Sequence, residues 1–125
     1  MIDAIEKYAS VVNTEVNSWF KAGSVSDFPE NSGACVKYKD KQIAVFNFKL
    51  MNKWYACQNL CPHKMEMVLS LGLIGDKNGV PKVACPLHKK NFSLEDGSGL
   101  TDESLRIAVY PVKIEGGNVY IGFSD

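Results

Sequence analysis

The chain has 125 residues, 46% of them hydrophobic and 22% charged, which is the composition of one globular domain and excludes a disordered chain. Lys and Arg together number 14, as do Asp and Glu, so a formal net charge of zero gives no general attraction to nucleic acid or to an anionic membrane. No apolar run approaches the roughly 20 residues of a membrane span, and residues 1–10 lack the apolar stretch of a secretory signal. We therefore expect a cytoplasmic protein, in which cysteines are metal ligands or buried thiols rather than disulfides.

The first element that we predict is a short amphipathic helix over residues 1–12. Its apolar residues recur at three- and four-residue intervals, namely Ile2, Ile5, Tyr8 and Val12. We interpret residues 1–14 as an extension that packs on the body of a single domain, residues 1–125. A partner-binding helix is the alternative.

From residue 16 onward the pattern becomes that of a β protein. Short runs rich in Val, Ile, Tyr, Phe and Trp are separated by turn residues, and they predict strands over 16–22, 34–39, 42–48, 53–59, 83–86, 105–114 and 118–123. We expect hairpin turns at 39–41 and 116–118 and a loop at 28–33. Because the strands follow each other closely with no helical pattern between them, the fold class is all-β, a small antiparallel sandwich or barrel.

Two short motifs contain both histidines of the chain: Cys61-Pro62-His63 and Cys85-Pro86-Leu87-His88. They lie in a segment where prolines and glycines interrupt the strand pattern, which predicts two irregular loops on the β body. Each loop supplies one sulfur and one nitrogen. Thiolate suits iron–sulfur, zinc or Cu(I) centres and imidazole suits iron and zinc, so the two motifs predict a metal site.

A [2Fe–2S] cluster fits this set of ligands, with Cys61 and Cys85 on one iron and His63 and His88 on the other. The alternative is a structural zinc site, although such sites usually pair two cysteines in one half and two histidines in the other. Both histidines are then committed to the metal, so we expect no catalytic residues in this chain.

The other two cysteines, Cys35 and Cys57, alternate with apolar strand residues, and we interpret both as buried thiols. We expect a packing role for the methionines beside the first motif, Met65 and Met67; shielding of the cluster or contact with a partner is the alternative. Four lysines near the motifs form either a solvated surface or a positive rim for docking, namely Lys64, Lys82, Lys89 and Lys90.

The C-x-H and C-x-x-H motifs, one in each loop of an all-β chain, resemble the ligand motifs of the Rieske [2Fe–2S] family. The resemblance covers residues 16–123. It implies an antiparallel β-sandwich with an inserted cluster-binding subdomain at about residues 57–95.

Residues 61–76 and 81–94, above all the run Pro81-Lys82-Val83-Ala84-Cys85-Pro86-Leu87-His88-Lys89-Lys90, are similar to the small subunits of assimilatory NAD(P)H-dependent nitrite reductases. This similarity implies electron transfer to a large subunit that carries FAD, an iron–sulfur cluster and sirohaem and reduces nitrite to ammonium. Generic Rieske ferredoxins tend to have glycine where this chain has Lys89. Two alternatives are a free-standing ferredoxin that serves an oxygenase and a non-redox assembly subunit with zinc or no metal.

The resemblance also bears on redox potential. High-potential Rieske proteins carry a serine and a tyrosine, two and four residues after the second histidine, whose hydroxyls hydrogen-bond to sulfur and raise the potential. Those positions hold Lys90 and Phe92 here. The disulfide that joins the two loops in those proteins is also missing, since Pro86 and Leu87 leave no cysteine for it. We predict a low-potential, ferredoxin-like cluster.

Overall fold

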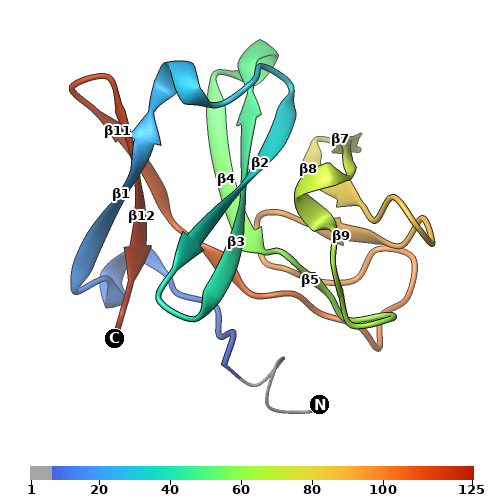
Figure 1. Cartoon of the computed structure of the whole chain (residues 1–125). Helices are drawn as coiled ribbons and strands as arrows, with labels where there is room; N and C mark the ends of the chain where they lie inside the picture. The colour runs from blue at the N-terminus through green and yellow to red at the C-terminus, as the bar shows by residue number, and fades with distance from the viewer. Residues whose placement is uncertain (1–6) are drawn as a thin grey trace.

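The computed structural model describes residues 7–125, and its two main sheets face each other (Figure 1). One sheet has the order β1 (Ser18–Ser24), β12 (Asn118–Phe123) and β11 (Val112–Glu115). The other has the order β10 (Val109–Tyr110), β4 (Lys53–Gln58), β3 (Lys41–Phe48) and β2 (Ser32–Tyr38). All strand pairs in both sheets are antiparallel, so the predicted all-β sandwich is confirmed.

A smaller lobe lies beside the second sheet, on the side away from the first sheet (Figure 1). It consists of a two-stranded hairpin, β5 (Leu60–Cys61) with β6 (Glu66–Met67), and of a three-stranded sheet, β7 (Leu73–Lys77), β8 (Val80–Ala84) and β9 (Asn91–Ser93). The described helices are single 3₁₀ turns: η1 (Asn13–Glu15), η2 (Val25–Asp27), η3 (Lys49–Met51) and η4 (Leu69–Leu71). No helix within residues 7–125 has the length and hydrophobicity needed to cross a membrane.

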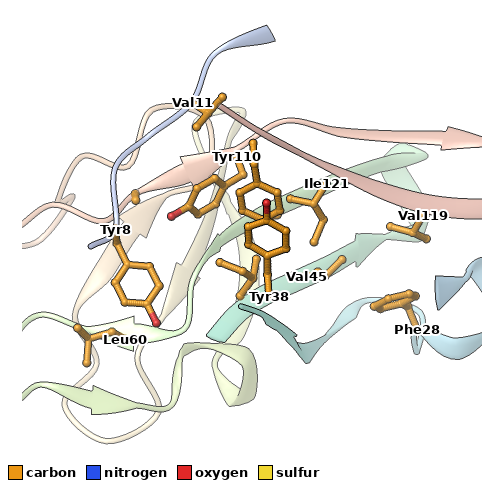
Figure 2. Packing of buried hydrophobic residues seen from close by; sticks show 13 residues of the cluster. Tyr8, Val11, Phe28, Tyr38, Val45, Leu60, Tyr110, Val119 and Ile121 are labelled. Atoms are coloured by element: carbon orange, nitrogen blue, oxygen red, sulfur yellow. The ribbon is translucent and has the colours of Figure 1, made fainter. Parts of the chain in front are cut away.

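Strand β3 separates two hydrophobic cores, because alternate side chains of a strand point to opposite faces of its sheet. Ile43 and Val45 face the sandwich core, whereas Ala44, Phe46 and Phe48 face the core of the smaller lobe. This explains why residues 43–46 read as one continuous apolar run: all residues from Ile43 to Phe48 are buried on one face of the sheet or the other. In Figure 2 the labelled side chains of the sandwich core, among them Val45 and Ile121, come from both sheets.

The second core contains the two cysteines of the predicted metal site. Cys61 and Cys85 are each 1% exposed and pack with apolar residues of both the sheet and the smaller lobe, namely Phe46, Leu69, Val83, Phe92 and Ile107. The sulfur atoms therefore sit where the smaller lobe joins the sandwich.

The hairpin turns are confirmed. Tyr38 pairs with Lys41 across Lys39-Asp40, and Glu115 pairs with Asn118 across Gly116-Gly117. Both glycines have positive φ, 58° and 79°, as a two-residue hairpin turn of this hand requires.

The predicted N-terminal helix falls partly on residues 1–6, which lie outside the described residues. Residues 8–12 are described and are not helical. They form an extended segment that packs on the body: Tyr8 and Val11 are each 7% exposed, and the Val11 N–H donates to the Val109 carbonyl at 2.9 Å. Figure 2 shows both side chains in the core. The predicted helical face paired Tyr8 with Val12, whereas the structure buries Tyr8 and Val11 and leaves Val12 57% exposed.

The prediction that Cys35 is a buried thiol was wrong. Cys35 is exposed, whereas Cys57 is fully buried as predicted. Strand β2 lies at the edge of its sheet, and Cys35 and Lys37 point to its outer side while Val36 is half-buried. The side chains of β2 alternate between two faces as predicted, but Cys35 lies on the exposed face rather than the buried one.

Candidate metal centre

The first ligand motif forms the tip of the β5–β6 hairpin. Cys61 pairs with Glu66, so Pro62, His63, Lys64 and Met65 make the four-residue turn between the two strands. Proline suits this turn because it restricts φ and needs no hydrogen bond to its nitrogen. The turn holds Cys61 at its buried base and His63, which is half-buried, near its tip.

The second ligand motif forms the loop between β8 and β9. Ala84 pairs with Asn91, and the six residues between them contain Cys85 and His88. The loop is closed by its own backbone: the Cys85 N–H donates to the Lys90 carbonyl at 2.8 Å, and the Lys89 N–H donates to the Cys85 carbonyl at 2.9 Å. Cys85 is again buried at the base, and His88 is exposed near the tip.

The two loops share a backbone feature that the sequence did not reveal. The fourth residue after each cysteine, Met65 in one loop and Lys89 in the other, has a φ of 57°. Side chains other than glycine are strained in this left-handed region. Glycine after the second histidine, as in generic Rieske ferredoxins, would adopt this backbone conformation without strain. Lys89 adopts it at a cost in conformational energy.

Replacing Lys89 by glycine is therefore expected to stabilise the chain by up to about 1 kcal/mol, because glycine adopts positive φ without a steric penalty. Chemical denaturation of the purified protein measures the effect. Lys89→Ala is the matched control, since it removes the same charge and keeps the strain. Equal unfolding free energies for the two variants would contradict this explanation.

The two cysteines lie against each other at the bases of the loops. Burial raises the pKa of the Cys61 thiol to about 11, and the neighbouring Cys85 thiol adds to the increase. Backbone N–H groups of His63 and Lys64 act in the opposite direction because they donate toward the Cys61 sulfur. A metal that displaces the proton would find a thiolate already supplied with hydrogen-bond donors.

The two histidines lie against each other at the tips. Their ring centroids are 4.8 Å apart and the rings meet edge to face at 72°. Burial lowers the pKa of His63, and the nearby His88, Lys90 and Lys64 lower it further. A lowered pKa favours the neutral imidazole, the form that binds metals. Its Nδ1 atom is buried and has no hydrogen-bond partner among the described residues.

The structure therefore brings the predicted ligands together in two pairs, Cys61 with Cys85 and His63 with His88. Within residues 7–125, no three Cys, His, Asp or Glu side chains surround a single point. A buried nitrogen with no partner is costly unless something outside the chain satisfies it. Two sulfurs for one iron and two imidazoles for the other fit a binuclear cluster of the Rieske type.

The surroundings of the loops differ in part from the prediction. Met65 and Met67 are 38% and 36% exposed, so their predicted packing role was wrong. Met65 lies in the hairpin turn and Met67 lies in β6. Of the four lysines, Lys82 donates to Asn91 Oδ1 at 2.7 Å and Lys90 lies 3.8 Å from Asp102, whereas Lys64 and Lys89 are exposed.

Two residues that support the site were missed from the sequence. Asn59 lies in the short connection before Cys61 and is 2% exposed. Gly72 packs so closely on β8 that a Cβ atom there would lie 2.3 Å from the Ala84 carbonyl oxygen. The only sequence signal for Asn59 was a polar residue between apolar neighbours in the segment that leads to Cys61. Gly72 could not be distinguished by sequence from the other glycines of the irregular segment.

Comparison with known proteins agrees with this geometry. The sequence profile of the Rieske-like [2Fe-2S] domain matches residues 18–122. The chain belongs to this family. A Rieske-type [2Fe–2S] cluster is thus the cofactor of the fold, and the four side chains at the loop bases and tips have the chemistry to hold it.

Several relatives contain the same domain in different settings. A nitrite reductase [NAD(P)H] from Emericella nidulans is 46% identical over 77% of this chain, but the chain spans only 9% of that protein. The small subunit of nitrite reductase (NADH) from Escherichia coli K12 is 30% identical over 85% of this chain and 98% of its own length. The ferredoxin component of a naphthalene 1,2-dioxygenase/salicylate 5-hydroxylase system from Ralstonia sp is 33% identical over 78% of this chain and 88% of its own.

A solved structure supports the same grouping. The crystal structure described as an NADH-dependent nitrite reductase small subunit from Mycobacterium tuberculosis has a TM-score of 0.79 and 29% identity, covering 85% of this chain and 95% of that one. Within the Rieske-like family, the chain therefore groups with nitrite reductase small subunits.

Proposed function

We propose that Cys61 and Cys85 bind one iron of a [2Fe–2S] cluster and that His63 and His88 bind the other. Two observations support this assignment. The buried thiols lie at the bases of the two loops and the adjacent imidazoles at their tips. The His63 Nδ1 atom is buried and has no hydrogen-bond partner among the described residues. The cluster-binding part then corresponds to residues 57–95, within a single domain whose residues 1–14 form an extension.

When bound, the cluster supplies a one-electron redox centre. The chain's own contribution is to bury the sulfur side against the second core and to leave the histidine side near the surface. Neutral imidazoles place less negative charge on the cluster than thiolates do, which favours the reduced form and raises the potential relative to an all-cysteine site. We assign no catalytic side chain to this polypeptide.

The reaction that we propose for the complete enzyme is the NAD(P)H-dependent reduction of nitrite to ammonium in the cytoplasm, on a large subunit with FAD, an iron–sulfur cluster and sirohaem. The Emericella relative supports this, because it contains the same domain as 9% of one long nitrite reductase polypeptide. A domain that is fused to its partner in one protein and free in another is expected to dock on the corresponding partner.

The docking surface that we propose consists of the tips of the two ligand loops. Three exposed apolar side chains lie there, Leu87 at 52% and the methionines Met65 and Met67, and the exposed lysines Lys64 and Lys89 flank them. An apolar centre with a charged rim is typical of a protein interface. An acidic surface on the large subunit would fit it.

Reversing both charges, Lys64→Glu with Lys89→Glu, is expected to slow association with the large subunit about tenfold at low salt, and the difference should shrink as salt is added. Surface plasmon resonance over a salt series measures this. Lys21→Glu, on the exposed side of β1 in the other sheet, is the matched control. If the double variant associated at the wild-type rate at low salt, the rim would have no part in docking.

The test of the ligand assignment is the metal content of the protein. Two iron and two sulfide per chain, a red-brown colour and an EPR signal of low average g after dithionite support the cluster. A colourless, zinc-containing preparation would support the assembly subunit instead.

A second candidate is a free ferredoxin that serves an oxygenase, since the Ralstonia ferredoxin component is 33% identical. The two candidates differ in their partner. Co-purification with a nitrite reductase large subunit, together with stimulation of nitrite reduction by added small subunit, favours the first. Electron delivery to a dioxygenase with no effect on nitrite reduction favours the second.

The reduction potential of the proposed cluster is expected to be low for a Rieske protein. Because Lys90 and Phe92 carry no hydroxyl toward the cluster, we expect a midpoint below about +100 mV. Phe92→Tyr is expected to raise it by tens of millivolts if the added hydroxyl reaches sulfur. Phe48→Tyr adds a hydroxyl elsewhere in the same core and is the control. Protein-film voltammetry measures both. A wild-type midpoint well above that limit would refute the low-potential assignment.

A further inference from the structure

The residue that precedes β5, Asn59, ties the first ligand loop to the sandwich with every polar group it has. Its carbonyl accepts from the N–H groups of Val68 and Leu69, both at 3.0 Å. Its side-chain Oδ1 accepts from the Ser70 N–H at 2.7 Å. These three consecutive N–H groups belong to the start of η4, where a helical turn leaves its donors unsatisfied. Asn59 thus closes the segment that contains Cys61 and His63.

Asn59 is itself held by strand β3 and by the N-terminal segment. Its N–H donates to the Gln42 carbonyl at 2.9 Å, and its Nδ2 donates to Gln42 Oε1 at 3.0 Å. The Gln42 N–H in turn donates to the Tyr8 hydroxyl at 2.9 Å. Tyr8 is buried and lies ahead of residues 18–122, the part of the chain that matches the family profile. The extension therefore reaches the ligand loop through the Tyr8 hydroxyl, which contacts the Gln42 backbone, and through the bonds between Gln42 and Asn59.

The second ligand loop has no such dependence. The backbone of residues 85–90 closes that loop, and β8 and β9 continue its hairpin. The first loop is flanked only by two pairs of residues, Leu60 with Met67 and Cys61 with Glu66. A short hairpin of this kind is marginal by itself. The bonds from Asn59 are therefore expected to contribute to where Cys61 and His63 lie relative to Cys85 and His88, together with the bond from Gln58 Nε2 to the Leu60 carbonyl at 2.7 Å.

We propose that Asn59 is a positioning residue for the metal centre and that Gln42 and Tyr8 hold it in place. The proposal rests on the proposed ligand role of Cys61 and His63. It adds that the N-terminal extension helps to shape the first ligand loop.

The principal test compares Asn59→Ala with Asn59→Asp in the full chain. The alanine variant loses the Ser70 and Gln42 side-chain bonds, and we expect shifted or broadened EPR g values and less iron per chain. The aspartate variant keeps an acceptor for Ser70 and is expected to recover part of both. Asn47→Ala removes another buried asparagine, whose Nδ2 donates to the Phe28 carbonyl at 3.4 Å, and should lower stability without changing the g values. Wild-type g values and iron content in Asn59→Ala would overturn the proposal.

Amide hydrogen exchange in the metal-free protein separates this proposal from the proposed function. Losing the Asn59 Oδ1 acceptor should speed exchange at the Ser70 amide about tenfold in Asn59→Ala, whereas Val68 and Leu69, which donate to the backbone carbonyl that alanine keeps, serve as internal references. If the wild-type chain binds no cluster, the ligand assignment fails. The role of Asn59 is then judged by exchange alone, and unchanged protection at the Ser70 amide would overturn it.

Tyr8→Phe gives a variant that keeps the buried ring and loses only the hydroxyl. It is expected to speed exchange at the Gln42 amide and, to a smaller extent, at Ser70. Tyr110→Phe is the matched control, because its hydroxyl is buried with no hydrogen-bond partner among the described residues. Equal exchange at Gln42 and Ser70 in the two variants would remove Tyr8 from the network.

Discussion

Replacing His63 and His88 together by alanine is expected to abolish the cluster while leaving the sandwich folded. Neither ring belongs to either hydrophobic core, whereas Cys61 and Cys85 are both buried in the second core. The histidine variant therefore removes metal ligands without leaving a cavity in the core, which a change at either cysteine would do. Iron and sulfide analysis should fall to background, and far-UV circular dichroism should remain that of a β protein.

The control for this variant is Leu87→Ala. Leu87 lies in the same loop as His88, is 52% exposed, and offers no ligand atom. Its replacement should leave the iron content unchanged. If the double histidine variant kept two iron per chain, the assignment of both nitrogens would be wrong, and with it the Rieske character of the cluster.

The strands that could be predicted from the sequence are those with an apolar pattern of their own. Residues 118–123 were predicted with both ends correct, and residues 42–48 were one residue short, because Lys41 begins β3. The run 105–114 was predicted as one strand, yet only β10 and β11 form there, with Pro111 between them. Proline has no N–H for a sheet, which explains the break.

Strands β5, β6, β7 and β9 were missed altogether. β5, β6 and β9 have two or three residues each, too few for a pattern to repeat. Tertiary contacts rather than local preference stabilise such strands. The ligand motifs were found because metal chemistry restricts residue type and spacing, a signal that does not depend on secondary structure.

The two residues that support the ligand loops, Asn59 and Gly72, could not be predicted from the sequence in the same way. Asn59 acts through hydrogen bonds to residues nine to eleven positions later, and Gly72 acts through the absence of a side chain against β8. Neither role has a pattern of its own. Both depend on which segments the fold brings into contact.

Replacing Gly72 by alanine is expected to disrupt the supports of both ligand loops. Gly72 ends η4, the turn that follows the first ligand loop, and the Ala84 carbonyl oxygen that a Cβ would meet at 2.3 Å directly precedes Cys85. A side chain of Val83 would lie at 2.8 Å. The added methyl group must therefore push the supports of the two ligand loops apart. Overpacking of this kind costs on the order of 1–3 kcal/mol of unfolding free energy.

The distinguishing consequence is that the Gly72 variant should lose iron as well as stability. Separation of η4 from the end of β8 moves the Cys61 loop relative to Cys85, and a cluster bridged by both loops tolerates little movement. Gly75→Ala is the matched control, since Gly75 lies in β7 three residues later and a Cβ there meets nothing within 4 Å. Denaturant unfolding and iron analysis on both variants provide the comparison. A Gly72 variant that kept wild-type stability and full iron would show that the two loops do not depend on this contact.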